Sequence, residues 1–158
     1  MNLHRVRPFA MIVLFALVAS APAYATAPPG RYMLTEKTAY DTKTKLTWQR
    51  ADAPGTYTWA GAKSYCASVG ASLDGQTWRL PTVKELQTIV DHMNAYPAVD
   101  ATVFSFSNFY AHWTLSRAIG KVGSSIVSAW YVDFGWGEST WINVDEAVVP
   151  DISVRCVR

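Results

Sequence analysis

The sequence has few charged residues, and it contains only one long apolar run. Of its 158 residues, 16% are charged and half are hydrophobic, which excludes a disordered or fibrous chain. The length suits one domain with a buried core. No linker, repeat or low-complexity stretch interrupts the chain after its first part, so we predict a single domain over residues 38–158.

The single apolar run lies near the N-terminus. Arg5 and Arg7 precede it, the run itself covers residues 9–18, and small residues lead to Ala25. A basic segment, an apolar segment and an A-x-A site, in this order, are typical of a secretory signal peptide. The run is too short to span a bilayer. We therefore expect a signal peptide over residues 1–25, an N-terminal tether over residues 26–37, and a secreted or periplasmic protein.

The predicted mature chain lacks net charge. Two of the 14 basic residues, Arg5 and Arg7, lie in the signal segment, which leaves 12 basic against 12 acidic side chains. A protein without a net positive field has no general attraction for nucleic acid or an anionic membrane. We therefore expect no nucleic-acid partner and no anionic-membrane partner. We also expect no membrane span, because no second apolar run follows the first.

Cysteine is scarce, with Cys66 and Cys156 alone. In an oxidising compartment a pair of cysteines favours a disulfide, and the alternatives are two free thiols or a metal site. His92 and His112 show no metal-ligand spacing relative to either cysteine, which disfavours the metal site. In the chain-entropy description, the loop closed by a Cys66–Cys156 bridge would stabilise the fold by roughly 4–5 kcal/mol.

Two helices are predicted from apolar spacing and capping residues. The first covers residues 58–70, with Thr58 as N-cap and Gly70 after its last turn, and it places Cys66 on the apolar face. The second begins with the capping box Thr82-Val83-Lys84-Glu85. Its apolar stripe and its end are formed by Leu86, Ile89, Val90, Met93, Asn94 and Pro97.

The remaining elements are predicted to be strands. A hairpin is expected over residues 38–49, and further strands over residues 109–115, 126–134, 140–144 and 152–157. In the last strand, alternation places Ile152, Val154 and Cys156 on one inward face. Both cysteines are thus expected to face the core.

No known catalytic motif occurs in the sequence, and both cysteines are needed for the predicted bridge. We therefore predict no catalytic residue, no cofactor and no bound metal. A cluster of acidic residues could hold a weak cation site, although solvated turn acids are the simpler interpretation. These acids are Asp133, Glu138, Asp145 and Glu146. The segment at residues 120–125 is interpreted as a loop, because its glycines, lysine and serines do not follow the order of a phosphate-binding motif.

Four residues are candidates for ligand binding. Trp136 stands between two glycines in a predicted turn, where no core is available to bury it. Tyr131 and Trp141 belong to the same aromatic-rich hairpin. Arg79 precedes the second helix, where it could bind an anion or tie loop carbonyls together. Glu85 is interpreted as the capping partner.

Several motifs in order resemble the Lcl C-terminal domain family of exported bacterial proteins, which includes collagen-like adhesins. They lie at residues 41–49, 59–66 (WAGAKSYC), 78–86 (WRLPTVKEL), 130–134 and 154–158. The resemblance implies a non-catalytic binding or adhesion module for a glycan or an envelope partner. Sulfated glycosaminoglycans are a ligand class that it suggests. No collagen-like repeat is present here.

Two looser resemblances concern the fold. The W-x-x-A-x-x-x-C helix is similar to the C-type lectin-like fold, and R-L-P-T-x-x-E-L is similar to formylglycine-generating enzymes. They imply an α+β fold in which two helices flank a twisted antiparallel sheet, with one disulfide. The lectins' calcium loop is missing. The alternatives to a binding module are an enzyme or enzyme subunit of the formylglycine-generating group, and a structural component of an envelope assembly.

Overall fold

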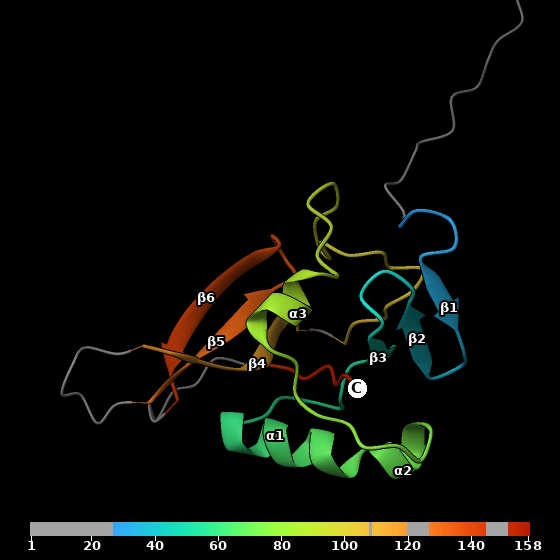
Figure 1. Cartoon of the computed structure of the whole chain (residues 1–158). Helices are drawn as coiled ribbons and strands as arrows, with labels where there is room; N and C mark the ends of the chain where they lie inside the picture. The colour runs from blue at the N-terminus through green and yellow to red at the C-terminus, as the bar shows by residue number, and fades with distance from the viewer. Residues whose placement is uncertain (1–26, 108, 120–126, 145–151) are drawn as a thin grey trace, which may run out of the picture.

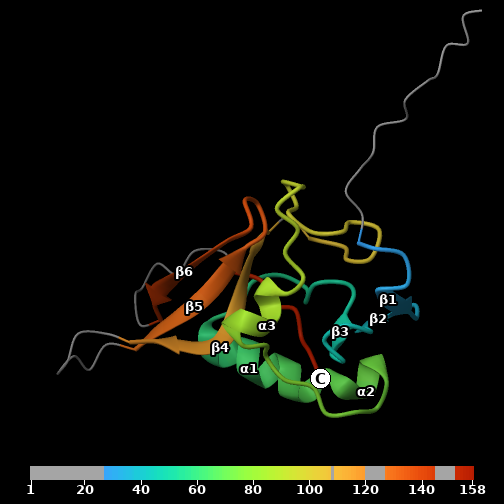
Figure 2. The same ribbon diagram turned by 45° about the horizontal axis from the view of Figure 1, so that its top comes forward.

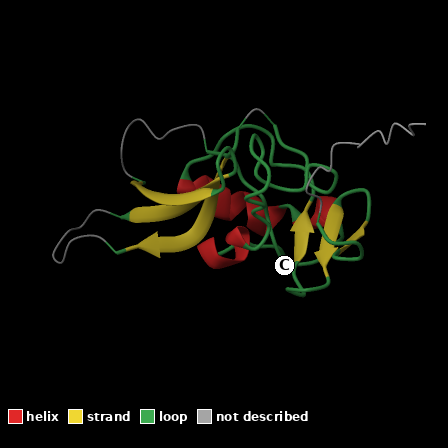
Figure 3. Ribbon diagram, turned by 90° about the horizontal axis from the view of Figure 1, so that it is seen from above, coloured by secondary structure: helices red, strands yellow, loops and turns green. Residues whose placement is uncertain are grey.

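The computed structural model describes residues 27–107, 109–119, 127–144 and 152–158. Two small antiparallel sheets and three short helices make up the described part. The strands lie toward the two ends of the domain, and the helices lie mostly between them (Figure 3). The predicted signal peptide (1–25) and the predicted loop at 120–125 lie outside the described residues. No helix in the described ranges is long and apolar enough to cross a membrane.

The first sheet contains β1 (Tyr32–Leu34), β2 (Thr38–Asp41) and β3 (Thr47–Gln49), in that order. The predicted hairpin at 38–49 is confirmed, because β2 and β3 pair in antiparallel register. Strand β1 pairs with β2 and lies within residues 26–37, the segment predicted as a tether. The ordered sheet therefore begins earlier in the chain than the sequence indicates.

The second sheet contains β4 (Ala111–Ala118), β5 (Ser128–Asp133) and β6 (Glu138–Asn143), also in chain order. It lies across the domain from the first sheet (Figure 1). These strands confirm three of the four predicted strands that follow the helices, with shifted ends. Alternate residues of β5 face two different groups of core residues, since Ala129 packs near the disulfide and Val132 packs near Trp48.

The first predicted helix is present as α1 (Trp59–Ser68), and the Thr58 side chain accepts a hydrogen bond from the Gly61 amide as expected of an N-cap. Gly70 does not simply end this helix, because it begins a second short helix, α2 (Gly70–Leu73). A β-carbon at Gly70 would lie 1.9 Å from the Gln76 carbonyl oxygen. Glycine is therefore required here by the close approach of the following loop.

The second predicted helix is much shorter than expected. Helix α3 covers Val83–Gln87; its Thr82–Glu85 capping box is confirmed, but the helix does not continue to Asn94. The amides of residues 88–90 donate to carbonyls three residues earlier, which tightens and ends the helix. Ile89 is still buried by this turn, whereas Met93 is 82% exposed, so its predicted place in the apolar stripe is wrong.

The C-terminal segment, residues 152–158, also differs from its prediction. It makes isolated bridges and no regular strand: Ser153 pairs with His112 of β4, and Val157 pairs with Trp48 of β3 and with Arg79. Residues 152–157 are all buried, so alternation does not separate an inner from an outer face. The reason is that the segment runs between the two sheets and is enclosed on both sides (Figure 2).

Cys66 and Cys156 form the predicted disulfide, with their α-carbons 5.5 Å apart. The bond joins α1 to the C-terminal segment at the centre of one core cluster, which also contains Trp78 and Trp113. A second cluster surrounds Trp48 and packs α3 against β5. All three tryptophans are buried.

Candidate binding site

An exposed pair of aromatic rings is formed by Trp136, on the connection from β5 to β6, and Tyr96, in the segment between α3 and β4. Trp136 is 60% exposed and Tyr96 is 52% exposed, and their ring centroids lie 4.6 Å apart at an interplanar angle of 72°. His92 is exposed as well and packs beside the same turn. We refer to Trp136, Tyr96 and His92 as the aromatic turn site.

Backbone hydrogen bonds hold the two segments of this site together. The Tyr96 amide donates to the Gly135 carbonyl at 3.1 Å, and the Ala98 amide donates to the Phe134 carbonyl. Within the turn, Asp133 accepts from the Gly135 amide at its side chain (2.7 Å) and from the Gly137 amide at its carbonyl (2.8 Å). The rings of Trp136 and Tyr96 therefore project from two segments that backbone hydrogen bonds hold together.

The two glycines around Trp136 make room for its neighbours. A β-carbon at Gly135 would lie 3.4 Å from the Tyr96 ring. Gly137 has a φ of +77°, and a β-carbon there would lie 2.9 Å from Val90 and 3.0 Å from the His92 ring. The Gly-Trp-Gly sequence thus reflects both the turn and the close packing of the aromatic turn site.

Further ring contacts connect the site to the core. Tyr96 packs edge-on against Tyr110, Tyr110 contacts Phe106, and Phe106 contacts both Phe134 and His112. Tyr96 is the residue that sequence reasoning missed, because its partner Trp136 is 40 residues away and no local pattern joins them. Pro97, which follows Tyr96, is predicted together with Asn94 only to end the second helix.

Beneath these rings lies a buried ionic cluster that the sequence also did not reveal. His112 Nε2 lies 2.9 Å from Asp52 Oδ1, and Arg155 donates to the same oxygen. Burial raises the pKa of Asp52, but the charges of Arg155 and His112 more than offset this, so that its pKa lies below the ordinary value. Burial lowers the pKa of Arg155.

Arg155 also donates to the carbonyls of Gln49 and Ser105, at 2.9 Å each. The rings of Phe104 and Phe106 flank its guanidinium. The cluster therefore ties the C-terminal segment to the loops around β3, and both Nη atoms of Arg155 donate to the protein's own acceptors.

The four candidate ligand residues do not lie together in the structure. Arg79 forms a two-pronged ion pair with Glu85, with Nη1–Oε2 and Nη2–Oε1 distances of 2.8 and 2.6 Å. Hydrogen bonding from Arg79 is the main cause that lowers the pKa of Glu85 to about 2, against the opposing effect of burial. Arg79 Nη1 also donates to the Leu80 carbonyl at 3.4 Å, so the guanidinium binds a loop carbonyl, as one of its two predicted roles requires, and the Glu85 carboxylate takes the place of an external anion.

Tyr131 and Trp141 lie on opposite faces of the second sheet. Tyr131 is opposite Thr140 and Trp141 is opposite Trp130, and successive residues of a strand alternate between faces. Tyr131 packs edge-on against Trp113 at 6.4 Å, and burial raises its pKa. Trp141 is 56% exposed, but it lies three residues along β6 from the turn, a distance of about 10 Å.

The acidic hairpin is described only in part. Asp133 and Glu138 lie opposite each other in register, and the Asp133 carboxylate accepts the Gly135 amide. Asp145 and Glu146 lie outside the described residues. Among the residues that are described, no group of three or more His, Cys, Asp or Glu side chains is placed to hold a metal ion.

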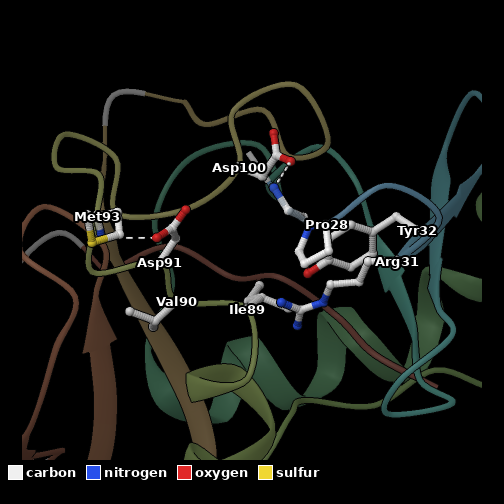
Figure 4. A pocket seen from close by; sticks show the side chains of 9 residues that line it. Pro28, Arg31, Tyr32, Ile89, Val90, Asp91, Met93 and Asp100 are labelled. Carbon is white, nitrogen blue, oxygen red and sulfur yellow. Dashed lines mark hydrogen bonds between the residues drawn. The ribbon is translucent and has the colours of Figure 1, made fainter. Parts of the chain in front are cut away.

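Hollows also lie on the surface of the described residues. One, of about 260 Å³, lies between the first described residues and the loop after α3 (Figure 4). Another, of about 300 Å³, lies beside Trp59, where Lys63 Nζ is 3.7 Å from the ring centroid, and Arg117 also lines it.

These features define a small disulfide-linked α+β domain with an exposed aromatic pair on its surface. The chain belongs to the Lcl C-terminal domain family, whose model matches residues 37–158. The predicted family is confirmed by this match. No curated protein and no solved structure shows significant similarity to the chain.

Proposed function

We propose that this domain is a non-catalytic, exported binding or adhesion module, and that the aromatic turn site binds the ring faces of a glycan. The observation that carries the proposal is the exposed Trp136–Tyr96 pair, held in place by backbone hydrogen bonds between two segments. Tyr and Trp provide a large contact area at low cost in conformational entropy. A ligand that packs on rings already fixed in place does not have to order them.

The charge balance favours a neutral glycan over a polyanion. The predicted mature chain carries equal numbers of basic and acidic residues, and the turn that bears Trp136 is built around the carboxylate of Asp133. A sulfated glycosaminoglycan would meet no net positive field on such a protein. We therefore expect weak retention on heparin at physiological salt.

A C-type lectin-like architecture is part of the same proposal. Its support is a disulfide that joins the first long helix to the end of the chain, together with helices placed against an antiparallel sheet. The proposed role is non-catalytic because formylglycine-generating chemistry needs a reactive thiol, and both cysteines are bonded to each other. Labelling the unreduced protein with a thiol reagent tests this. A modified cysteine would favour the enzyme alternative over a non-catalytic role.

The glycan proposal is tested by an array screen followed by calorimetry on the best ligand. Trp136→Ala and Tyr96→Ala should each weaken binding at least tenfold, because each removes half of the ring pair. Trp141→Ala is the matched control, since Trp141 is about equally exposed on the same hairpin but lies away from the turn. Equal effects of Trp136→Ala and Trp141→Ala, or no glycan retained by the wild-type domain, would overturn the proposal.

A further inference from the structure

His112 is fully buried, and both nitrogens of its ring face oxygen atoms. Nε2 lies 2.9 Å from Asp52 Oδ1, and Nδ1 lies 2.8 Å from the Tyr110 carbonyl oxygen. A neutral imidazole carries a hydrogen on only one of its two nitrogens, so it can donate to only one of these oxygens. Two hydrogen bonds therefore require either an imidazolium or an oxygen that brings its own hydrogen.

Neither oxygen brings a hydrogen. The Tyr110 carbonyl can only accept, and it also accepts the Phe134 amide at 3.0 Å. Asp52 Oδ1 accepts from Arg155, and Oδ2 accepts the Ser107 amide at 3.1 Å. Burial raises the pKa of Asp52, but the charge of Arg155 and the other donors hold it below the ordinary value, so the carboxyl is ionised. Both hydrogens must then come from the ring.

The groups around the ring show which charge of this cluster can be removed. Asp52 and Arg155 are the charged groups that the described contacts bring to His112, and the rings of Phe106 and Phe134 pack edge-on against it without charge. Arginine keeps its proton at all accessible pH values. Two positive charges share one carboxylate and repel each other, so the proton on His112 is the one that leaves.

We propose that His112 makes this domain pH-sensitive: its imidazolium bonds Asp52 to the Tyr110 carbonyl, and release of its proton to solvent breaks one of the two bonds. After release, a bare ring nitrogen faces the lone pairs of an oxygen in a site that water does not reach. The proposal is independent of glycan binding.

Segments that are distant in the chain meet at this ring. His112 lies on β4, Asp52 follows β3, and the C-terminal segment reaches both through Arg155 and through the bridge of Ser153 to His112. Loss of the proton should therefore weaken the contact between the two sheets. Because the folded state holds a proton that the unfolded chain gives up more readily, stability should fall as the pH rises.

The direct test is 15N NMR of the ring nitrogens of the labelled protein between pH 6 and pH 9. At pH 6 His112 should show two slowly exchanging ring N–H signals, assigned through bonds to its backbone, and at pH 9 it should show one. The exposed His92 is the control and should titrate as in a peptide. A single N–H on His112 at pH 6, two that persist at pH 9, or a titration identical to that of His92 would each overturn the proposal.

Thermal unfolding provides the second readout. The wild-type midpoint should be about 5 °C higher at pH 6 than at pH 8.5, as expected for one charge-assisted hydrogen bond in a domain of this size. His92→Gln should keep this difference and His112→Gln should lose it; the same difference in both variants would contradict the assignment. The NMR measurement needs no variant, so it decides the question even where His112→Gln does not fold.

Discussion

Removal of the Cys66–Cys156 disulfide should destabilise the domain strongly. The bond spans a sequence separation of 90 residues, for which the chain-entropy description gives about 4.6 kcal/mol at 25 °C. The native state should change little, because the C-terminal segment keeps its backbone bonds to β3: the Gln49 amide donates to the Cys156 carbonyl, and the Arg158 amide donates to the Thr47 carbonyl. The loss then comes mainly from greater freedom of the unfolded chain.

The assay is calorimetry of the mature protein with and without reductant, beside the double variant Cys66→Ala/Cys156→Ala. A loss of about 4.6 kcal/mol corresponds to a fall of about 15 °C in the unfolding midpoint for a domain of roughly 130 residues. The double variant is the control, since reductant should not change its midpoint. If reduction lowers the wild-type midpoint by less than about 3 °C, the bond does not hold this fold together and the reasoning is refuted.

Three further perturbations follow from the geometry. Gly137→Ala should lower the free energy of unfolding by about 1–3 kcal/mol in denaturant and weaken glycan binding. The reason is that alanine would have to adopt a positive φ and its β-carbon would press on Val90 and His92; an unchanged midpoint would contradict this. Asp52→Asn should cost about 3–5 kcal/mol, since it leaves Arg155 buried without a counter-charge, whereas the exposed Glu36→Gln should be neutral in the same assay. The pKa of Glu85 is lowered to about 2, so the ionised side chain stabilises the fold above the ordinary glutamate pKa, and this stabilisation is lost as the pH falls toward 2. In an acid titration, Glu85→Gln should therefore lose less stability than wild type over that pH range.

Local signals in the sequence were sufficient for the elements whose contacts are local. The Thr58 cap, the Thr82–Glu85 capping box and the β2–β3 hairpin each depend on residues within a few positions of one another, and each is present. The length of α3 was not predictable from its apolar stripe. Ile89 remains buried after the helix tightens into a turn, so the same spacing is compatible with a short helix.

Long-range features were beyond the reach of sequence patterns. Arg155 and Asp52 are 103 positions apart, and a charged residue in an alternating apolar segment ordinarily indicates an outward position. It is buried here because the C-terminal segment has protein on both sides. The same limit applies to the aromatic turn site. The exposure of Trp136 could be predicted from its flanking glycines, but the contact of Tyr96 with Trp136 exists only in the folded chain.

The position of the C-terminal segment separates the stability of this domain from its proposed binding surface. Within seven residues, this segment makes the disulfide to α1, the ion pair to Asp52 and the bridges to β3 and β4. Trp136 makes none of these contacts and is 60% exposed, so truncating it removes little buried area and should leave folding intact. A loss of ligand binding in Trp136→Ala with an unchanged unfolding midpoint would therefore report on recognition alone. The same loss accompanied by a fall of several degrees would mean that the ring supports the turn and does not act as the contact surface.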